Sequence, residues 1–362
     1  MRNDGLPRVD TADRPGSWCW LVARDAEGEV RGGVSPLPGG NAGGIPSAAS
    51  PLSGIAVEAA GFNYKDALAC EGHPGVARRL PLVPGIDVAG VLRTKAGDLE
   101  AGTPVVVTGN GLGESRHGGF ATEVWVDPEA IIKRPATLSA EAAMALGTAG
   151  LTAVLATDRL AAVIGWQAGR SQPATPTWLV TGASGGVGML AVAAAARAGN
   201  HVIACTRKTG VEETLRGLGA QSVITPAAAV ASGNKPLASG RYLAVIDTVG
   251  GDLLADLLRV VQPGGAVASI GNAGGAELQT TVYPFILRGV TLTGIDAAGL
   301  PSQADRRRLW PRLADLWPQV ADQFPVCRLP LDEVGGWARK MRAGETSGRA
   351  VVIPSLLTRT EA

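Results

Sequence analysis

The sequence predicts an α/β protein in which a β-rich region precedes a doubly wound parallel sheet. Three observations predict this. From about Trp178 onward short apolar strands alternate with helical segments, a glycine-rich turn follows the first of these strands, and β-like pieces between Gly/Pro turns fill the first part. Strands joined by helices need crossover connections, which give a parallel sheet covered on both faces. A chain of 362 residues is long enough for about two domains.

Six strands are expected in the second part: "TWLV", "HVIAC", "SVI", "YLAVID", "GAVASIG" and "GVTLTGID". The helices expected between them are "VGMLAVAAAARAG", which ends at Gly199, then "VEETLRGLG" and "LLADLLRVV". Their apolar residues recur with helical spacing, whereas the strands are short and continuously apolar. This order of elements predicts a six-stranded doubly wound domain.

The first part contains β-like segments such as "GIAVEAAG", "GVLRT" and "TPVVVTG", which favour a compact and mostly antiparallel β domain. The segment "SAEAAMALGTAGLTAVLATDRLAAV" predicts a long helix between the domains, with Ser139 as its N-cap. After Asp305 the sequence returns to a helix and then to apolar pieces, which we expect to pack back on the first domain.

Composition and charge exclude several classes of protein. The net charge of +1, with acidic and basic residues scattered, gives no general reason to bind nucleic acid or an anionic membrane. The longest apolar stretch, 142–166, is interrupted by Asp158 and Arg159 and is therefore not expected to be a membrane span. The four cysteines are far apart, as expected in a reducing cytoplasm. Residues 1–16 are expected to be a flexible leader, and no role is assigned to the Gly/Pro-rich loop 36–52.

A glycine-rich turn, "VTGASGGVGML" over residues 180–190, joins the first of the six strands to a helix. Its "ASGGVG" fits the six positions of a dinucleotide-binding fingerprint. Gly185 lets the backbone touch a pyrophosphate, and Gly188 lets the helix lie close to the sheet. Glycines also serve tight turns without a ligand, but the strand before and the helix after favour a nucleotide. Because a helix N-terminus attracts phosphate, we expect contacts from Ser184, Gly185, Gly186 and Val187.

The end of the next strand selects the cofactor. Enzymes selective for NAD usually carry an Asp or Glu there, about 20 residues beyond the fingerprint, to hold the ribose hydroxyls. This chain has Thr206, Arg207 and Lys208 instead. A hydroxyl and two cations suit a 2′-phosphate, while the structural alternative is a solvated basic turn. The sequence therefore predicts NADPH.

Six segments occur in a familiar order over nearly the whole chain: "NYKDALA", "PLVPGIDVAGVLRT", "MALGTAGLTAVLA", "VTGASGGVG", "AVIDTVGG" and "TTVYPFILRGVTLTGID". Together they closely resemble the zinc-independent medium-chain dehydrogenase/reductases, specifically the acrylyl-CoA reductase (AcuI/YhdH-like) branch of the quinone oxidoreductase group. The last segment is the one specific to that branch. The resemblance implies a GroES-like β-rich catalytic domain plus a Rossmann doubly wound parallel sheet, NADPH, and reduction of an activated carbon–carbon double bond.

On this basis the GroES-like catalytic domain is expected over residues 17–140, completed by 303–362, and the Rossmann domain over 141–302. The resemblance also implies a homodimer, and the last strand, 289–296, has an exposed edge that a second copy can extend. No metal is expected. Zinc-dependent relatives have Cys where this chain has Asn63 and a His-Glu pair where it has Ile86 and Asp87, and Ile86 cannot bind a metal.

Without a metal, alcohol oxidation is disfavoured and an enone or α,β-unsaturated thioester fits better. Hydride would add to the β-carbon and a proton to the α-carbon, with stabilisation of the enolate oxygen. Tyr64, on the segment that faces the nicotinamide in the family, is the first candidate catalytic and cofactor residue; a packing role is the alternative. Asn63 is a candidate for orienting the substrate carbonyl or the nicotinamide amide. Adjacent Lys65 and Asp66 are expected to be a structural pair or a helix-start feature.

Further candidates rest on position. Thr148 resembles a residue near the nicotinamide end of the cofactor, or it is a helix-packing Thr. Thr248 and Asn272 follow strands at the carboxyl edge of the sheet, where a cofactor is expected. Arg288 is a candidate for the CoA phosphates or the thioester, or for a domain-bracing ion pair. The run Arg306–Arg308 with Arg312 is a candidate CoA diphosphate site or a solvated face.

Three functions remain open at this stage. The first is an NADPH-dependent reductase of a small α,β-unsaturated acyl-CoA. The second is a quinone or enone reductase that uses the same hydride chemistry without CoA. The third is a non-catalytic NADPH-binding protein, because a fold alone does not establish catalysis.

Overall fold

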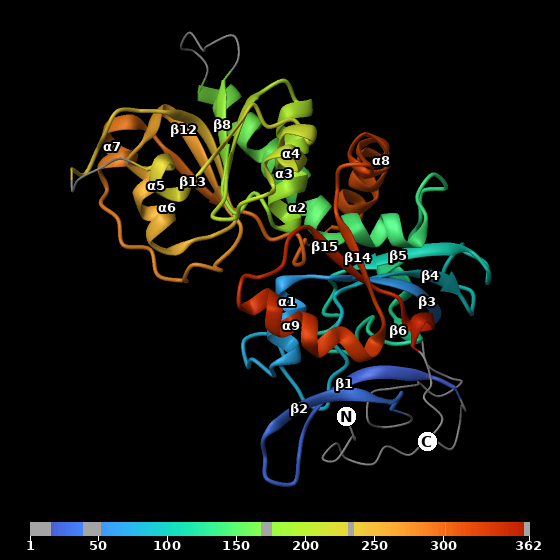
Figure 1. Cartoon of the computed structure of the whole chain (residues 1–362). Helices are drawn as coiled ribbons and strands as arrows, with labels where there is room; N and C mark the ends of the chain where they lie inside the picture. Colours follow the sequence, from blue (N-terminus) through green and yellow to red (C-terminus); the bar gives the residue numbers. More distant parts are fainter. Residues whose placement is uncertain (1–15, 39–51, 168–175, 231–234, 301, 358–362) are drawn as a thin grey trace. The chain divides into compact units, whose positions relative to one another are not determined.

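The computed structural model describes residues 16–38, 52–167, 176–230, 235–300 and 302–357 (Figure 1). The chain forms two compact units, the first from residues 1–148, 298–317 and 326–362, and the second from 149–297 and 318–325. The unit boundaries at 148/149 and 297/298 differ from the expected 140/141 and 302/303. Nearly all of the predicted leader and most of the loop 36–52 lie outside the described residues.

The second unit contains a six-stranded parallel sheet with the order β10-β9-β8-β11-β12-β13. This confirms the predicted Rossmann sheet. The chain starts in the middle of the sheet and reverses direction between β8 and β11, so the carboxyl ends of those two strands flank the point where such folds bind nucleotides. The strands are β8 (Thr177–Val180), β9 (His201–Cys205), β10 (Ser222–Ile224), β11 (Tyr242–Asp247), β12 (Val261–Ser269) and β13 (Thr291–Gly294).

Helices connect these strands and pack on them. They are α3 (Gly186–Arg197), α4 (Glu212–Gly217), α5 (Pro226–Ala229), α6 (Gly251–Leu258) and α7 (Tyr283–Arg288). The end of α3 agrees with the prediction, because Gly199 lies just beyond the helix with a φ of 85° that favours glycine. The sequence prediction did not include the short helices α5 and α7.

The first unit is built on a seven-stranded sheet with the order β14-β15-β3-β4-β5-β7, and β6 also pairs with β3. All its pairs are antiparallel except β14 with β15, as the sequence predicted for this region. The strands are β3 (Ser53–Phe62), β4 (Asp87–Leu92), β5 (Pro104–Thr108), β6 (Glu123–Val126), β7 (Ile132–Lys133), β14 (Val326–Leu329) and β15 (Arg349–Val352). In Figure 1 the last strand, β15, lies beside β3, so the tail does pack back on the first domain.

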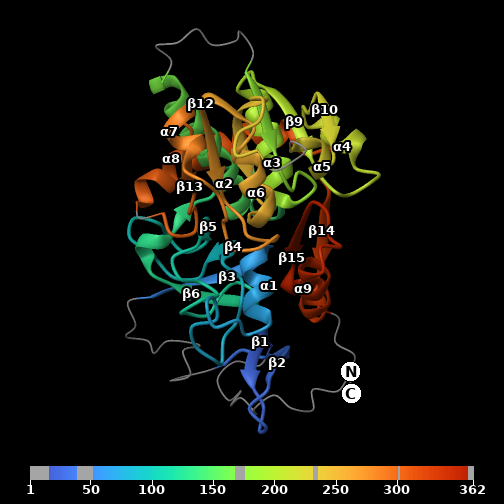
Figure 2. The same ribbon diagram turned by 90° about the vertical axis from the view of Figure 1, so that its left-hand side faces the viewer.

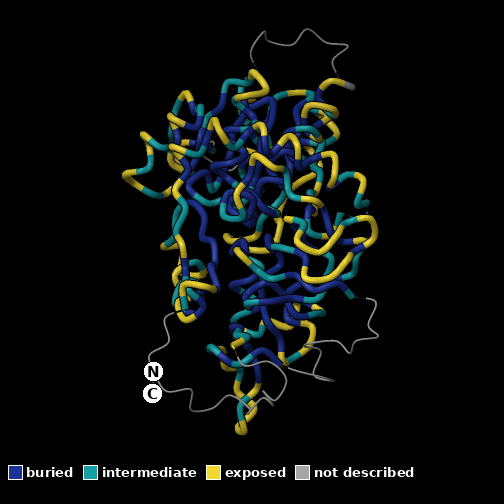
Figure 3. The backbone as a smooth tube through the Cα atoms, turned by 90° about the vertical axis from the view of Figure 1, so that its right-hand side faces the viewer, coloured by how far each residue is buried: buried dark blue, intermediate teal, exposed yellow. Residues whose placement is uncertain are grey.

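Other elements complete the first unit. A two-stranded sheet consists of β1 (Trp18–Arg24) and β2 (Val30–Pro36). Helix α1 (Tyr64–Cys70) packs against α9 (Val334–Arg342), and Figure 2 shows the two side by side. Short 3-10 turns lie at η2 (Pro128–Ala130), η3 (Leu331–Glu333) and η4 (Pro354–Leu356), and α8 (Gln303–Val320) follows the second unit in the chain. In Figure 3 the buried residues lie mostly in the interior of the trace, while exposed residues lie mainly on its outer turns.

The long helix α2 (Ala140–Gln167) is broken by a kink at Gly147, where φ is 43° and ψ is −145°. Ser139 caps its start, as predicted, since the Ser139 Oγ accepts the Ala142 N–H at 3.1 Å. The boundary between the two units follows one residue after the kink. Among the described residues, α2 is also the one helix long and apolar enough to cross a membrane. However, 83% of its most apolar window is buried, as in the core helix of a soluble protein.

Candidate cofactor and active site

The glycine-rich turn has the shape of a phosphate cradle. It runs from the end of β8 into α3, whose N-cap is Gly185 and whose first turn is capped by no side chain. A Cβ at Gly188 would collide with the Gly182 carbonyl oxygen, so only glycine lets the helix approach β8 this closely. A Cβ at Gly185 would meet one atom, that same oxygen at 3.3 Å. No side chain of the turn therefore covers the N–H groups of Gly186 and Val187. A diphosphate can come close to them, as dinucleotide binding requires.

A hydrogen bond joins the turn to the end of β9. The Thr206 hydroxyl donates to the Ser184 Oγ at 2.9 Å and accepts the Lys208 N–H at 3.1 Å. Both hydroxyl-bearing residues are buried, whereas Arg207 is exposed. Partial burial lowers the pKa of Lys208, and the neighbouring Arg207 charge lowers it further. Two cations that repel each other gain from an anion placed between them, so residues 206–208 fit a 2′-phosphate. We name residues 182–188 and 206–208 the glycine-turn edge.

The ends of β8 and β11 are tied together beside this turn. Asp247 accepts the Thr181 hydroxyl at 2.6 Å and the Gly250 N–H at 2.8 Å, although burial raises its pKa. Thr248 donates its N–H to the Thr181 Oγ1 at 3.0 Å and its hydroxyl to the Thr181 carbonyl at 2.9 Å. The Thr248 hydroxyl is thus engaged in holding the two strand ends. The pair of Thr181 and Asp247 was missed by the sequence reading.

Asn272 lies in the loop after β12, at the predicted carboxyl edge of the sheet. Its side chain is exposed, and its carbonyl oxygen accepts the Gly275 N–H at 3.1 Å. The loop also lies against the start of α6, because the Asn272 Cα is 3.2 Å from where a Cβ on Gly250 would stand. The backbone of Asn272 therefore shapes the edge, and its cofactor role stays a prediction.

Five polar residues form a buried polar cluster in the first unit: Asn63, Asp66, Asp87, Thr148 and Arg349. The Asn63 amide donates to the Asp87 Oδ2 at 2.9 Å and to the Asp66 Oδ2 at 3.2 Å. Its oxygen accepts from Arg349 at 2.9 Å. Asn63 and Asp87, the two positions compared above with the ligands of zinc-dependent enzymes, do meet. Because the Asn63 amide already binds three neighbours, the contacts favour an internal role over orienting a substrate.

Asp87 holds the kink of α2. It accepts the Thr148 hydroxyl on Oδ1 at 2.5 Å and the Thr148 N–H on Oδ2 at 2.8 Å. A Cβ at Gly147 would stand 2.5 Å from the Asp87 Oδ2, so this approach requires glycine. The contacts make Thr148 a residue that fixes the helix, and its predicted cofactor contact remains untested by them.

Asp66 and Arg349 are the charged interior of the cluster. Asp66 accepts the N–H groups of Gly85 at 3.0 Å and Ile86 at 2.9 Å, as well as the Asn63 N–H at 2.8 Å. Burial, opposed by these bonds and reinforced by the Asp87 charge, raises the pKa of Asp66 to about 7. The Arg349 guanidinium donates to the carbonyls of Phe62, Met144 and Ala145. Burial lowers the pKa of Arg349, and the two carboxylates oppose that shift.

Asp66 stabilises the start of α1. This is one of the two roles expected for Lys65 and Asp66, that of a helix-start feature. Asp66 is the third residue of the helix and accepts the N–H of the N-cap, Asn63. The other alternative, a pair with Lys65, is wrong. Lys65 forms its ion pair with Glu114 at 3.1 Å, since the two neighbouring side chains leave the helix in different directions.

Tyr64, the first residue of α1, is half-buried and lies against Arg342 at the end of α9. The Arg342 Nη1 donates to the Tyr64 Oη, and the guanidinium carbon lies 5.0 Å from the centre of the Tyr64 ring. Arg342 also forms an ion pair with Glu71, with Nε 3.2 Å from Oε2. The sequence reading did not single out Arg342, because the strand and helix contacts that bring residues 64 and 342 together are set by the tertiary fold.

Two cationic candidates have internal partners. Arg288 donates to the carbonyls of Ala238, Arg259 and Val261, so it braces the second unit through carbonyls rather than through the ion pair considered above. Its substrate role stays a prediction that these contacts disfavour. Neither expectation for Arg306 holds. It is 1% exposed and donates to the carbonyls of Ala298 and Leu300, whereas Arg308 is exposed and pairs with Asp305.

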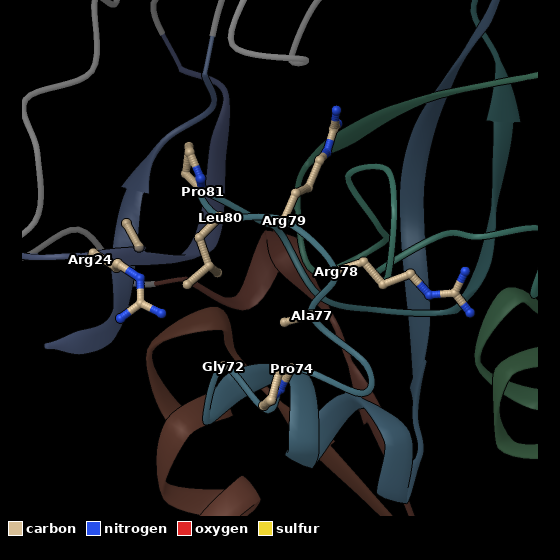
Figure 4. A pocket seen from close by; sticks show the side chains of 9 residues that line it. Arg24, Gly72, Pro74, Ala77, Arg78, Arg79, Leu80 and Pro81 are labelled. Atoms are coloured by element: carbon tan, nitrogen blue, oxygen red, sulfur yellow. The ribbon is translucent and has the colours of Figure 1, made fainter. Parts of the chain in front are cut away.

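No cluster of metal ligands is found in the described part of the chain, and one hollow lies apart from the residues discussed above. No group of three or more His, Cys, Asp or Glu is placed to hold a metal there, and the expected absence of a metal remains a prediction. All four cysteines are free thiols. Figure 4 shows a hollow of about 370 Å³ in the first unit, whose three arginines extend away from one another. Its lining residues are Ala23, Arg24, Gly72, Pro74, Ala77, Arg78, Arg79, Leu80 and Pro81.

Family models match both units. The model for the alcohol dehydrogenase GroES-like domain matches residues 53–136. The model for zinc-binding dehydrogenases matches residues 186–315. The first agrees with the GroES-like domain and the second with the Rossmann domain that the sequence predicted.

Individual relatives cover most of the chain. It is 39% identical to a probable acrylyl-CoA reductase of Escherichia coli over 80% of this chain and 87% of the relative. It is 37% identical to a putative quinone oxidoreductase of Bacillus subtilis over 83% and 91%. The solved YhdH oxidoreductase of Salmonella enterica, in complex with NADP, superposes with a TM-score of 0.82 at 34% identity, over 93% of this chain and 99% of that one. A Bacillus subtilis relative solved with NAD has a TM-score of 0.81 at 34% identity, over 94% and 100%. The chain therefore belongs to the medium-chain dehydrogenase/reductase family of oxidoreductases, in the group of the acrylyl-CoA reductases and their quinone oxidoreductase relatives.

Proposed function

We propose that the protein is an NADPH-dependent reductase of the carbon–carbon double bond of a small α,β-unsaturated acyl-CoA. The observation that carries the proposal is the glycine-turn edge, where uncapped amides of α3 stand beside Thr206, Arg207 and Lys208. The similarity of the whole chain to acrylyl-CoA reductases supports the proposed substrate class. A relative with NAD bound makes the choice of cofactor a point for experiment.

Each part of the site has a defined task in this reaction. Bound NADPH supplies the hydride, which adds to the β-carbon. The amides of Gly186 and Val187 hold the diphosphate, while the Gly185 N–H is bonded to the Gly182 carbonyl at 2.9 Å. Residues 206–208 hold the 2′-phosphate. As the β-carbon gains hydride, negative charge moves to the thioester oxygen, where a hydrogen-bond donor stabilises it. The Tyr64 phenol takes that role, and a proton reaching the α-carbon completes the saturated acyl-CoA.

The test is a spectrophotometric screen of NADPH oxidation with the purified protein. Acrylyl-CoA and crotonyl-CoA are compared with quinones and simple enones, and each assay is repeated with NADH. We expect turnover of a short enoyl-CoA, with NADPH preferred. Silence with every short enoyl-CoA would contradict the proposal. Tight NADPH binding without turnover of any substrate would identify a non-catalytic NADPH-binding protein.

A second candidate is a quinone or enone reductase, favoured by the similarity to a putative quinone oxidoreductase. The same cofactor site and the same hydride transfer serve both substrates. The two candidates separate on kcat/KM, because a CoA-dependent enzyme gains binding energy from the part of the substrate that does not react. A higher kcat/KM for a quinone than for every enoyl-CoA would favour this candidate.

We further propose that the protein acts in the cytoplasm as a homodimer formed through the second unit. β13 is an edge strand of its sheet. The neighbouring α7 segment exposes Val282, Ile286 and Leu287 to more than 60%, together with Tyr283. An exposed apolar face beside an open strand edge fits a second copy. Analytical ultracentrifugation should show a dimer that Ile286→Glu with Leu287→Glu converts to a monomer; a monomeric wild type would contradict this.

A further inference from the structure

Arg342 holds the Tyr64 side chain from two sides. One Nη group donates to the phenol oxygen, and the guanidinium lies over the ring, with its carbon 5.0 Å from the ring centre. The Nε edge of the same guanidinium is anchored by Glu71 at 3.2 Å. The contacts join α1 to α9. Because the Arg342 guanidinium is bonded to Glu71 through Nε and to Tyr64 through Nη1, it restricts the orientations of the Tyr64 side chain more than packing alone would.

The chemistry of arginine determines which way the phenol can donate. A guanidinium has N–H donors and no acceptor, whereas a phenol can both donate and accept. In the contact between them the Tyr64 oxygen is therefore the acceptor. The Tyr64 O–H therefore cannot donate to Arg342, and it can donate to another group.

We propose that Arg342 is a positioning residue for the reduction, which fixes the Tyr64 phenol as a hydrogen-bond donor to the carbonyl oxygen of the substrate. A positive charge that donates to the phenol oxygen also polarises the O–H bond. The O–H then binds most strongly where negative charge develops, which is the thioester oxygen in the transition state. No bond is broken by Arg342 or Tyr64 in this step. The inference rests on the proposed function and deepens its account of Tyr64.

The same arginine has one competing use, which the experiment must separate. The last turn of α9 also carries Arg339 and Lys340, and a cationic turn can bind a CoA phosphate. A phosphate contact would raise the KM for a CoA ester and leave an enone without CoA unaffected. A positioning role would instead lower kcat for both substrates.

The experiment is a double-mutant cycle in the full-length protein with Tyr64→Phe and Arg342→Met, assayed with crotonyl-CoA and with a simple enone. We expect Arg342→Met to lower kcat about 10-fold and Tyr64→Phe about 100- to 1000-fold, the size of a lost transition-state donor. The double variant should be no slower than Tyr64→Phe alone. Arg342→Lys should keep part of kcat, because an ammonium can also donate. Arg328→Met, which removes an exposed arginine of β14 paired with Glu141, is the control and should keep wild-type kcat.

A binding measurement supplies a readout besides activity. Calorimetry with butyryl-CoA, the unreactive saturated product, should give the same Kd for wild type and Arg342→Met. Circular dichroism checks the fold of each variant, and Arg342→Gln replaces Arg342→Met if the latter fails to fold. A weaker Kd with unchanged kcat would overturn the inference in favour of a phosphate contact.

The outcomes separate the inference from the proposed function. If Tyr64→Phe is slow but Arg342→Met keeps wild-type kcat, the inference fails and the proposed function stands. Additive losses in the double variant would also overturn it, because they mean that the two side chains act independently. If Tyr64→Phe keeps wild-type kcat, Tyr64 is not the donor and the inference fails, while the reductase activity of the wild type still stands.

Discussion

The polar groups of the buried polar cluster in the first unit and those of the glycine-turn edge in the second unit differ in how they are hydrogen-bonded. In the cluster, each carboxylate and amide binds other groups of the protein, and Arg349 compensates the charge of Asp66 and Asp87. At the edge, no side chain caps the first turn of α3, and the neighbouring charges of Arg207 and Lys208 repel each other. A satisfied cluster stabilises a fold, whereas uncapped amides at the start of a helix can bind an anionic ligand. The same polar residue types therefore predict structure in one unit and a cofactor in the other.

The largest effect is expected from removing the charge that compensates the cluster. Arg349→Met leaves Asp66 and Asp87 buried beside each other and deprives four oxygens of their donor. Breaking a buried ion pair in this way costs about 3–5 kcal/mol of the free energy of unfolding. Urea denaturation measures it. Arg328→Met, which removes an exposed pair with Glu141, is the control and should cost under about 1 kcal/mol.

The edge responds in ligand binding instead of stability. Replacing Arg207 and Lys208 by Ala removes two charge-assisted contacts to the 2′-phosphate and should weaken NADPH binding about 100-fold, with NADH little affected. Fluorescence titration with each cofactor measures the two Kd values. An equal loss for NADPH and NADH would show that these cations do not bind the phosphate. Unfolding in the absence of cofactor should be nearly unchanged, which distinguishes the edge from the cluster.

The cluster also predicts a pH dependence through Asp66, whose pKa is raised to about 7 by burial and, less strongly, by Asp87. Because the folded-state pKa lies above the unfolded value of about 3.9, the native state binds the proton more tightly. This contribution to the free energy of unfolding is complete below about pH 4 and is lost as the pH rises to about 7, by at most about 1.4 kcal/mol per pH unit.

Asp66→Asn should remove that slope from the pH dependence of stability. Urea denaturation of wild type and variant at several pH values between 4 and 8 gives the difference. Asp98→Asn, at an exposed carboxylate, serves as the matched control and should leave the slope of the wild type. A variant slope equal to the wild-type slope would mean that Asp66 is ionised throughout this range.

The smallest effect tests whether the edge has any structural role of its own. Thr206→Val keeps the shape of the side chain but removes the hydroxyl that binds the Ser184 Oγ and the Lys208 N–H. The expected cost is about 1 kcal/mol in thermal or urea unfolding. A loss as large as that of Arg349→Met would show that the edge is part of the stabilising interior, and the contrast between the two regions would fail.

Most of the fold could be predicted from sequence because its signals are local. Six apolar strands alternating with helices predict the order of a doubly wound sheet, and Ser139 and Gly199 mark helix ends through capping chemistry. The short helices α5 and α7 were missed, since four to six residues carry too little periodicity. The β1–β2 pair was also not identified.

The candidate site was predictable only where one short segment forms it. The glycine turn and residues 206–208 belong to a strand-turn-helix pattern that the sequence shows directly. The partners of Asn63 and Tyr64 could not be found in this way. Arg349 and Arg342 come from the far end of the chain, and only the pairing of β15 with β3 and of α9 with α1 brings them to the cluster and to the phenol. Arg306 was misread because three consecutive arginines do not reveal that the first points inward.

The bond between Thr206 and Ser184 has a consequence for any change of coenzyme preference, by evolution or by engineering. An Asp at position 206 would supply the carboxylate that binds ribose hydroxyls. It would lie beside Arg207 and Lys208, however, and these cations would pair with the carboxylate and compete with the ribose for it. It would also take the serine hydroxyl as a donor and alter the loop that receives the diphosphate. Positions 184 and 206–208 must therefore mutate as a set, and single steps toward NADH are expected to pass through a poorly binding intermediate.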